Sequence, residues 1–242
     1  MILAIDAGNT RIKWGLHDGK TWLFQGQHPH HEIDQFEHAL DQLPTPQQIV
    51  LSNVAGAQLQ DRLEHSLGRY SVRVQHVGAR ASQCGVRNVY ITSEQLGADR
   101  WAALIGAHRL GVRTGLVINA GTAITIDALH QGDFLGGIIL PGYHMMGSML
   151  VQGTAGLTHA PGKFRAWPDN TADALETGRI LAITGAVALM HEQLQRHSGD
   201  MPELMVSGGN GAQLAIHLSQ PVRLVENLVL EGLRTIASEE CL

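Results

Sequence analysis

Two short segments of this chain repeat one pattern, and the repeat limits how the chain can fold. Residues 5–10 and 118–123 each follow a short apolar run that is typical of a buried strand. Each run closes with Asp or Asn, then Ala, then Gly, then a residue with a hydroxyl or amide side chain. The equivalent residues Asp6 and Asn119 are 113 positions apart (119 − 6), close to half of the 242-residue chain. This spacing predicts two related halves, each built on a strand that ends in a glycine turn.

The turn has the residue types that bind a nucleotide phosphate and its metal ion. Glycine lets the backbone approach a phosphate, hydroxyl and amide groups donate hydrogen bonds to it, and a carboxylate holds a hard cation directly or through water. Lys13, on the outgoing strand of the first copy, could also reach a phosphate. Asp, Gly and Asn are common in ordinary hairpin turns as well. The second copy favours the phosphate interpretation, and two such turns facing each other would hold one ATP.

Composition and charge argue against several other classes of protein. A hydrophobic content of 44% and a charged content of 16% are those of an ordinary globular chain. The formal net charge of -5 and the absence of a Lys/Arg run argue against nucleic-acid binding. No segment approaches about 18 consecutive apolar residues, so we expect a soluble cytoplasmic protein with no membrane partner. The two cysteines, Cys84 and Cys241, predict no disulfide framework.

Apolar periodicity predicts strands and helices in two series, with a boundary between Gly111 and Gly115. The first series has expected strands at 1–6, 11–17, 21–24, 49–54 and 72–74, and expected helices at 33–43, 59–67 and from residue 97. The second has expected strands at 116–118, 124–128, 134–142 and 204–211, and expected helices at 144–152, 171–195 and 227–239. This order is typical of an α/β fold, with an N-terminal lobe at 1–113 and a C-terminal lobe at 114–242.

A second candidate site lies at the start of the helix expected from residue 97. Asp99 and Arg100 are adjacent there and could supply a proton acceptor beside a binding group for a carboxylate. The alternative is that Asp99 only caps the helix, since Asp is a preferred N-cap residue. Residues 207–211 contain a Gly-Gly pair against which an adenine ring could lie, or they form a strand-to-helix turn and nothing else.

Other residues and motifs are less informative. Four histidines lie in one polar stretch, and we expect them on a solvated loop and helix face instead of at a metal: His28, His30, His31 and His38. Neither a GxxxxGK[ST] loop nor a GxGxxG fingerprint occurs in the sequence. The commonest other nucleotide-binding folds are therefore not indicated.

With these motifs the sequence resembles the type III pantothenate kinases, a family in the superfamily of acetate and sugar kinases, heat-shock chaperones and actin. The resemblance covers nearly the whole chain and is carried by five segments in order. They are the first phosphate motif at 6–13, Tyr90 with the pantothenate-binding segment 97–100, the second phosphate motif at 119–127, a signature at 136–142, and the stretch 170–175.

The resemblance implies both a fold and a reaction. The implied fold is two ribonuclease-H-like lobes with ATP in the cleft between them. The implied assembly is a homodimer in which Thr171 of one subunit touches pantothenate bound to its neighbour. The implied reaction is transfer of the γ-phosphoryl group of ATP to pantothenate, giving 4'-phosphopantothenate in the first step of coenzyme A biosynthesis.

The resemblance also implies roles for individual residues. Asp99 would accept the proton of the pantothenate hydroxyl, and Asp6 would organise Mg²⁺ through water. The implied ATP-binding residues are Asp6, Ala7, Gly8, Asn9, Thr10, Arg11, Ile12, Lys13 and Thr122. The implied substrate-binding residues are Tyr90, Gly97, Ala98, Asp99, Arg100 and Thr171.

One position departs from the family pattern, and two other functions stay open. The family begins its second phosphate motif with Asp, which binds a monovalent cation, whereas this chain has Asn119. The amide oxygen remains a ligand without the charge, so little dependence on K⁺ or NH₄⁺ is expected. A non-catalytic accessory or regulatory relative would also suit Asn119, although Asp99 and Arg100 argue against it. A sugar kinase of the same superfamily is disfavoured by the short chain and the absence of a Cys-rich zinc segment.

Overall fold

The computed structural model describes residues 1–158 and 160–238, which fold into two compact units. The first unit comprises Met1–Val112, Gly132–Phe134 and the described residues from Asn227 onward. The second unit comprises Arg113–Gln131 and Leu135–Glu226. The final helix thus belongs to the first unit, whereas the sequence-based division assigned it to the C-terminal lobe.

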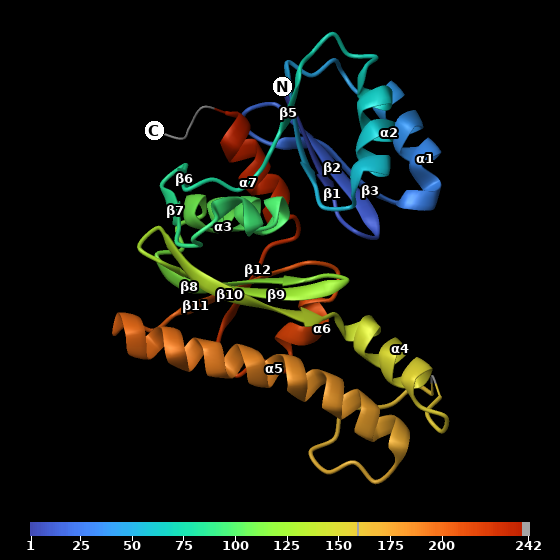
Figure 1. Cartoon of the computed structure of the whole chain (residues 1–242), viewed down its shortest axis with the longest axis vertical. Helices are drawn as coiled ribbons and strands as arrows, with labels where there is room; N and C mark the ends of the chain where they lie inside the picture. Colours follow the sequence, from blue (N-terminus) through green and yellow to red (C-terminus); the bar gives the residue numbers. More distant parts are fainter. Residues whose placement is uncertain (159, 239–242) are drawn as a thin grey trace. The chain divides into compact units, whose positions relative to one another are not determined.

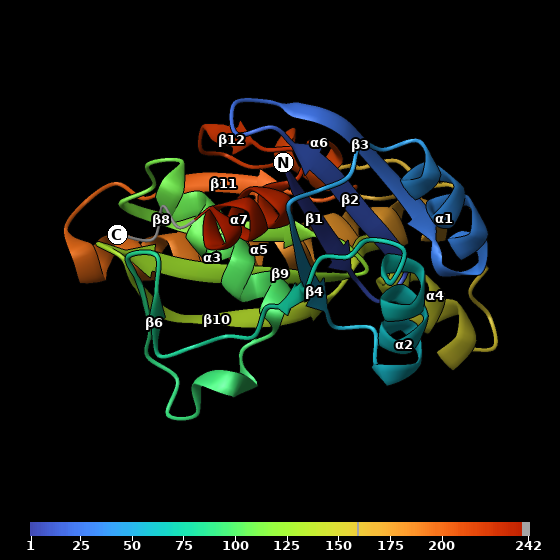
Figure 2. The same cartoon turned by 90° about the horizontal axis from the view of Figure 1, so that it is seen from above.

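The first unit is built on a five-stranded sheet with the order β3-β2-β1-β4-β5 (Figures 1 and 2). Its strands are β1 (Ile2–Ala7), β2 (Arg11–His17), β3 (Trp22–Pro29), β4 (Gln48–Asn53) and β5 (Val74–His76). Strands β1 to β3 form an antiparallel meander, and β4 and β5 continue the sheet in parallel with β1. The central strand β1 is buried along its whole length, which explains why its sequence is a continuous apolar run up to Asp6.

Helices pack against this sheet through two sets of contacts. Helices α1 (Ile33–Asp41) and α2 (Ala57–Leu67) share one hydrophobic core with alternate residues of β1, among them Leu3 and Ile5. Helix α7 (Leu228–Ala237) contacts β1 and β4, and it packs closely against α3 (Ala98–Arg109). This approach requires glycine, because a Cβ atom at Gly232 would lie 1.7 Å from the carbonyl oxygen of Ala102. Helix α3, which carries Asp99, is thereby fixed to α7 and the sheet.

Several short elements complete the first unit. They are η1 (His30–Glu32), β6 (Ser82–Gln83), β7 (Val86–Asn88) and η2 (Ser93–Gln95). Strand β7 pairs in parallel with Asp133 and Phe134, the first two residues of β10 (Asp133–Pro141). Cys84 is disulfide-bonded, so the expectation from the cysteine count is wrong at this residue.

The strands of the second unit follow the order β12-β11-β8-β9-β10. They are β8 (Thr114–Ala120), β9 (Ala123–His130), β10, β11 (Glu203–Ser207) and β12 (Val222–Leu224). Strands β8 and β9 form an antiparallel hairpin, and β11 and β12 extend the sheet in parallel with β8. The unit therefore repeats the hairpin-plus-parallel-strand plan of the first unit.

The second unit also contains α4 (Tyr143–Gly153), α5 (Thr171–Ser198) and α6 (Gly211–Ala215). Helix α5 runs along one face of the sheet (Figure 1), and Ile180, Ile183 and Val187 place its buried side in the same core as β8. The helix begins where the Asn170 side chain accepts a hydrogen bond from the Asp173 N–H at 2.9 Å. It ends at a left-handed Gly199, with φ of 76°.

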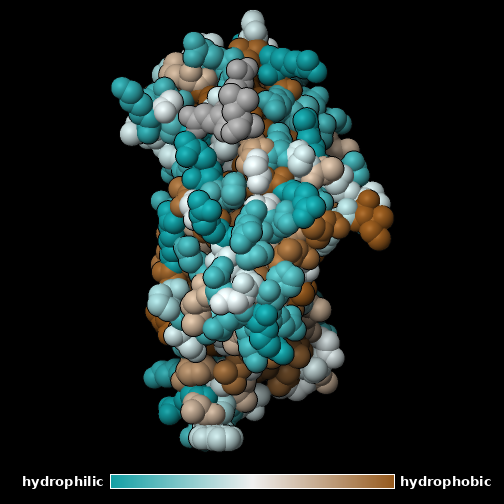
Figure 3. Space-filling view, turned by 90° about the vertical axis from the view of Figure 1, so that its left-hand side faces the viewer, coloured by the Kyte–Doolittle hydropathy of each residue, from teal (hydrophilic) through white to brown (hydrophobic). Residues whose placement is uncertain are grey.

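The long periodic elements agree with the sequence-based prediction, and the short ones do not. The strand expected at 72–74 is displaced to Val74–His76, and β6, β7, β12 and α6 were not predicted. The closing helix is present, but Glu239, its expected end, lies outside the described residues. No helix within residues 1–158 and 160–238 is long and apolar enough to cross a bilayer. Hydrophilic and hydrophobic residues are interspersed on the face seen in Figure 3.

Candidate active site

The first phosphate motif forms the tip of the β1–β2 hairpin. The register pairs Ala7 with Ile12, and the Gly8 N–H donates to the carbonyl oxygen of Arg11 at 3.1 Å. The side chains of Ala7 and Ile12 are fully buried, so they anchor the turn in the core and are not available to a ligand. Residues 9–11 are exposed. Between Ala7 and Ile12, backbone groups and the side chains of residues 9–11 are available to contact a phosphate.

Asp6 and Lys13 are direct cross-strand partners, so their side chains share one face of the sheet. Asp6 is only 8% exposed, and its Oδ1 atom is buried without a hydrogen-bond partner. The pKa of Asp6 is raised to about 7, first by burial and second by the Asp99 carboxylate, while the Lys13 ammonium opposes the shift. A buried carboxylate oxygen without a partner needs an explanation, and a hydrated cation would supply one.

Asp99 is the second residue of α3, and Gly97 is the N-cap. Its Oδ1 atom accepts a hydrogen bond from the N–H of Arg100 at 2.8 Å. The alternative that Asp99 is the N-cap residue is therefore wrong. Burial raises the pKa of Asp99, an effect partly offset by the backbone N–H and the guanidinium of Arg100. A partly buried carboxylate with a raised pKa is a suitable proton acceptor.

Tyr90 and Arg100, two residues expected to bind substrate, meet at the ring of Phe134. The Arg100 guanidinium lies 5.8 Å from the Phe134 ring centroid, and the Tyr90 and Phe134 centroids are 5.2 Å apart. Asn88 holds this segment, because its Oδ1 atom accepts from the Tyr90 N–H at 3.0 Å. Arg100 is buried beside Asp99. The arrangement offers a fixed cation to a small carboxylate next to the candidate base. Phe134 was not identified from the sequence.

The second phosphate motif forms the tip of the β8–β9 hairpin. Asn119 pairs with Thr125, and the Gly121 N–H donates to the carbonyl oxygen of Ala123 at 3.1 Å. Asn119 is half-buried, and Thr122 is exposed at the tip. The second turn therefore presents an amide and a hydroxyl, and no ionised side chain from these positions.

Two other backbone segments support this second turn. The Gly142 N–H donates to the carbonyl oxygen of Thr122 at 2.9 Å, and the Asn210 N–H donates to that of Ala120 at 3.1 Å. Gly208 has φ of 97°, and a Cβ atom there would lie 2.6 Å from the Ala120 carbonyl oxygen, so glycine is required. Residues 207–211 thus support the phosphate turn, and contact with adenine stays a prediction.

Thr171 is the exposed first residue of α5, and a buried polar cluster holds that end of the helix. The Tyr143 hydroxyl lies 2.5 and 2.6 Å from the two carboxylate oxygens of Glu176. Glu176 also pairs with Arg179, whose guanidinium lies 4.3 Å from the Tyr143 ring centroid. Tyr143 follows the glycine that bonds the second turn, so the cluster links that turn to the start of α5. The sequence gives no signal for this cluster, because its members lie on two helices.

Two of the histidines expected in a solvated stretch are half-buried. The His28 ring stacks parallel to Trp14, with centroids 6.5 Å apart. The His30 ring nitrogen Nε2 lies 2.7 Å from the carbonyl oxygen of Gly8, in the first phosphate turn. The expectation is wrong for these two residues, whereas His31 and His38 are exposed.

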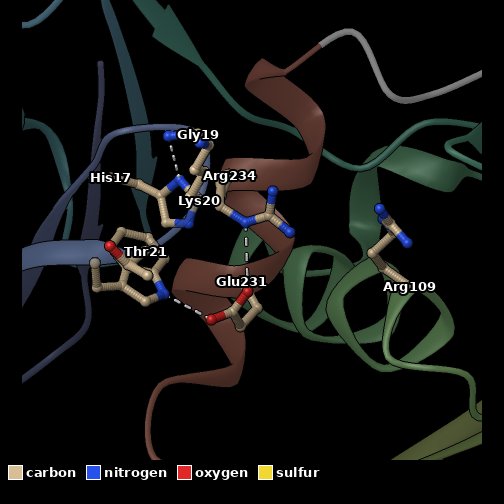
Figure 4. A pocket seen from close by; sticks show the side chains of 8 residues that line it. His17, Gly19, Lys20, Thr21, Arg109, Glu231 and Arg234 are labelled. Atoms are coloured by element: carbon tan, nitrogen blue, oxygen red, sulfur yellow. Dashed lines mark hydrogen bonds and ion pairs between the residues drawn. The ribbon is translucent and has the colours of Figure 1, made fainter.

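A cavity of about 470 Å³ also lies in the first unit (Figure 4). Its walls are formed by His17, Gly19, Lys20, Thr21, Trp22, Arg109, Glu231 and Arg234. The hairpin register pairs His17 with Ile2, at the opposite end of β1 and β2 from the turn. This cavity is therefore not the predicted nucleotide site.

Known proteins are similar in sequence to this chain over nearly its full length. The profile of the type III pantothenate kinase family matches residues 2–193. The protein named type III pantothenate kinase in Nitrosospira multiformis is 45% identical over 240 residues, covering 99% of this chain and 92% of that protein. The protein of the same name in Nitrosomonas eutropha is 45% identical over 242 residues, covering 98% and 94%. This chain belongs to the type III pantothenate kinase family.

Solved structures agree with this family assignment at the level of the fold. A putative Baf family transcriptional activator from Campylobacter jejuni has a TM-score of 0.66 and 24% identity, with 98% of both chains covered. MreB5 of Spiroplasma citri bound to ADP has a TM-score of 0.52 and 10% identity, with 96% of this chain and 94% of that chain covered. At these identities the likeness shows the fold alone. The predicted α/β fold with two lobes is confirmed.

A type III pantothenate kinase uses ATP, and the residues of this member fit a divalent cation that is held largely by water and phosphate. Among the described residues, no group of three or more His, Cys, Asp or Glu side chains could hold a metal ion. Mg²⁺ characteristically keeps several waters and binds one or two carboxylates together with substrate phosphates. The unpartnered Oδ1 atom of Asp6 suits such an ion.

Proposed function

We propose that this family member transfers the γ-phosphoryl group of ATP to the primary hydroxyl of pantothenate. One observation carries the proposal: the partly buried carboxylate of Asp99 lies close enough to the buried carboxylate of Asp6 to raise its pKa, with Lys13 beside Asp6. Phosphoryl transfer needs one group to organise the metal ion and another to accept the hydroxyl proton. The product, 4'-phosphopantothenate, is the first intermediate toward coenzyme A.

Asp99 serves as the proton acceptor in this proposal. The pantothenate hydroxyl oxygen attacks the γ-phosphorus, a new O–P bond forms, the bond to the ADP oxygen breaks, and the proton passes to Asp99. The raised pKa of Asp99 makes it a better base than an exposed carboxylate. Arg100 binds the carboxylate of pantothenate, and Tyr90 and the backbone at 97–98 line the acceptor site.

The two hairpin turns hold the nucleotide. Residues 7–13 contact the phosphates through backbone groups and through the side chains of Thr10 and Lys13, and Thr122 contributes a hydroxyl. Asp6 would hold Mg²⁺ through water, and the ion would neutralise charge on the phosphate oxygens. Positioning and charge neutralisation supply most of the catalysis in phosphoryl transfer, so the residues of the two turns need to form no covalent bond with the substrate.

Asn119 is proposed to weaken the site for a monovalent cation. An amide oxygen can still coordinate K⁺ or NH₄⁺, but it contributes no net charge. The nearest cross-strand neighbour, Thr125, is also neutral. Activity that depends little on the monovalent cation is therefore part of this proposal.

A homodimer is also part of the proposal, and an exposed stripe on α5 supports it. Helical positions three and four apart form a stripe of small residues and leucines that is exposed: Gly178, Leu181, Ala182, Gly185, Ala188 and Leu189. Leu181 and Leu189 are 53% and 62% exposed. Such a stripe lets a second helix approach closely, and two-fold symmetry would bring two copies of α5 together. Each subunit would then offer Thr171 to the pantothenate site of its partner.

Ultracentrifugation tests the assembly. The wild-type protein is expected to sediment as a dimer at assay concentration, and Leu181→Glu to sediment as a monomer with lost activity. An active monomer would contradict the dimer proposal without affecting the proposed reaction.

A coupled assay of ADP release tests the reaction itself. Pantothenate is expected to stimulate ADP release, whereas a panel of hexoses and N-acetylated sugars is not. Release with a sugar would favour the sugar-kinase alternative, and release with no acceptor tested would favour a non-catalytic relative. The cytoplasmic location belongs to the same proposal, because the reaction consumes ATP.

A further inference from the structure

His30 contacts the first phosphate turn at two points. Its ring Nε2 lies 2.7 Å from the carbonyl oxygen of Gly8, and its backbone N–H donates to the carbonyl oxygen of Thr10 at 3.3 Å. A carbonyl oxygen can only accept, so Nε2 carries the proton whatever the charge of the ring. One residue from outside the hairpin therefore holds two of the peptide groups at its tip.

We propose that His30 is a positioning residue that sets the direction of the peptide groups in the phosphate-binding turn. A peptide unit is planar and trans, so its C=O and N–H point in opposite directions. His30 holds the carbonyl groups of Gly8 and Thr10. The N–H groups of the same two peptide units, which belong to the next residues, Asn9 and Arg11, therefore point away from those contacts. Backbone N–H groups directed to one side bind phosphate oxygens. His30 thus keeps the turn ready for the nucleotide.

The chain around His30 gives this contact a rigid base. Pro29 ends β3 in register with Arg11 and has a φ of −60°, which its ring restricts. Three residues after His30, α1 begins at Ile33, and both Ile33 and Phe36 are buried in the hydrophobic core. The imidazole is therefore attached to the sheet on one side and to a packed helix on the other.

The tip of the turn, beyond the buried Ala7 and Ile12, is open to solvent. Residues 9–11 are exposed, and Gly8 adds backbone freedom that is lost when a ligand orders the turn. A side chain that orders the turn before binding removes that loss from the binding free energy, and so raises affinity. The inference rests on the proposed role of residues 6–13 in holding ATP, and it adds a residue that no phosphate motif contains.

Nucleotide affinity and steady-state kinetics of His30 variants test the inference. His30→Ala is expected to raise the Kd for Mg²⁺–ATP, measured calorimetrically without pantothenate, by about 5- to 10-fold, as for loss of one hydrogen bond. The KM for ATP should rise in parallel, while the KM for pantothenate stays within about 2-fold. His30→Gln retains an N–H donor of similar reach and should return the Kd to within about 2-fold of wild type. His31→Ala, an exposed neighbour, is the matched control and should bind like wild type.

Three results would overturn the inference. One is wild-type ATP affinity in His30→Ala. A second is equal loss in His30→Ala and His30→Gln, because the donor would then not be what matters. A third is the absence of ATP binding by the wild-type protein, which would also remove the nucleotide role of the turn. If the wild-type protein binds ATP but does not phosphorylate pantothenate, the proposed acceptor is wrong, and the Kd values still decide the role of His30.

Discussion

The two hairpin turns share a backbone plan but differ in charge. In the first turn Asp6 faces Lys13 across the hairpin, whereas in the second Asn119 faces Thr125. A carboxylate opposite an ammonium group in one copy is thus an amide opposite a hydroxyl in the other. The closing hydrogen bonds also differ, because Gly8 bonds to a residue three positions on and Gly121 to one only two positions on.

The supports of the two turns differ as well. The second turn is held by the backbone of residues 142 and 208–210, with glycines where a Cβ atom would collide. The first turn is held by His30, through both its side chain and its backbone N–H. In the proposed function, the first, charged turn would bind the metal ion and the phosphates, and the second, neutral turn would supply a rigid surface. Asn119 is then one part of a neutral turn and not an isolated departure.

The largest expected effect concerns Asp99, the proposed base. Asp99→Asn should lower kcat by about 10²- to 10⁴-fold, as is typical when a general base is removed. Gly97 provides the N-cap, and the Asn side chain can still accept the Arg100 N–H, so helix stability should change little. The measurement is the coupled ADP assay, with thermal unfolding as the control for folding. Near-wild-type turnover in a folded variant would leave Asp99 with no catalytic role.

The second prediction concerns how the buried Asp6 carboxylate makes the free energy of unfolding depend on pH. Because burial raises the pKa of Asp6 to about 7, the unfolded chain releases this proton at a lower pH than the folded protein does. The contribution of Asp6 to the free energy of unfolding should therefore fall as pH rises from about 4 to about 7, by up to about 4 kcal/mol, and stay level above. Asp6→Asn should remove this dependence and be more stable than wild type at pH 8, without Mg²⁺ or nucleotide.

Urea unfolding between pH 4 and 8 makes this measurement. Asn119→Asp, the reverse change in the neutral turn, is the matched variant and should lower stability at pH 8, by less, since Asn119 is only half-buried. An Asp6→Asn protein that is less stable than wild type at pH 8 would show that the carboxylate has a partner, and the charge contrast between the turns would fail.

Whether a feature could be predicted from the sequence depends on how far apart in the chain the residues that determine it lie. The two turns, the long helices and the start of α3 follow from local patterns, and all were predicted. The place of α7 in the first unit could not be, because it depends on close contact between Gly232 and Ala102, 130 residues apart (232 − 102). Phe134 and His30 were missed for the same reason, since each meets its partners only after the strands have paired.

The third prediction compares the residues that face each other across the two hairpins. Lys13→Ala should lower kcat/KM for ATP by about 10- to 100-fold, the range for a hydrogen bond from a charged donor to phosphate. Thr125→Val, at the equivalent place in the second hairpin, keeps the shape of the side chain and should stay within about 3-fold. Steady-state kinetics at varied ATP give both values. Equal losses of kcat/KM in the two variants would mean that the charged first turn is no more important for the use of ATP than the neutral second turn.

The smallest expected effect is on the monovalent cation, and it tests the neutral turn directly. An Asp in place of Asn119 would add a charge worth roughly 4 kcal/mol to a cation about 4 Å away at an effective dielectric of 20, before the cost of desolvation. Without that charge the site should bind K⁺ weakly, because hard cations follow ligand charge as well as ligand number. We expect the wild-type rate to change less than about 2-fold when potassium chloride replaces choline chloride at constant ionic strength, a comparison that holds screening constant. Asn119→Asp should make the rate rise with potassium, which would turn the neutral hairpin into a charged one. A wild-type protein that is nearly inactive without potassium would show that the amide oxygen is a sufficient ligand, and charge would then not be what separates the two turns.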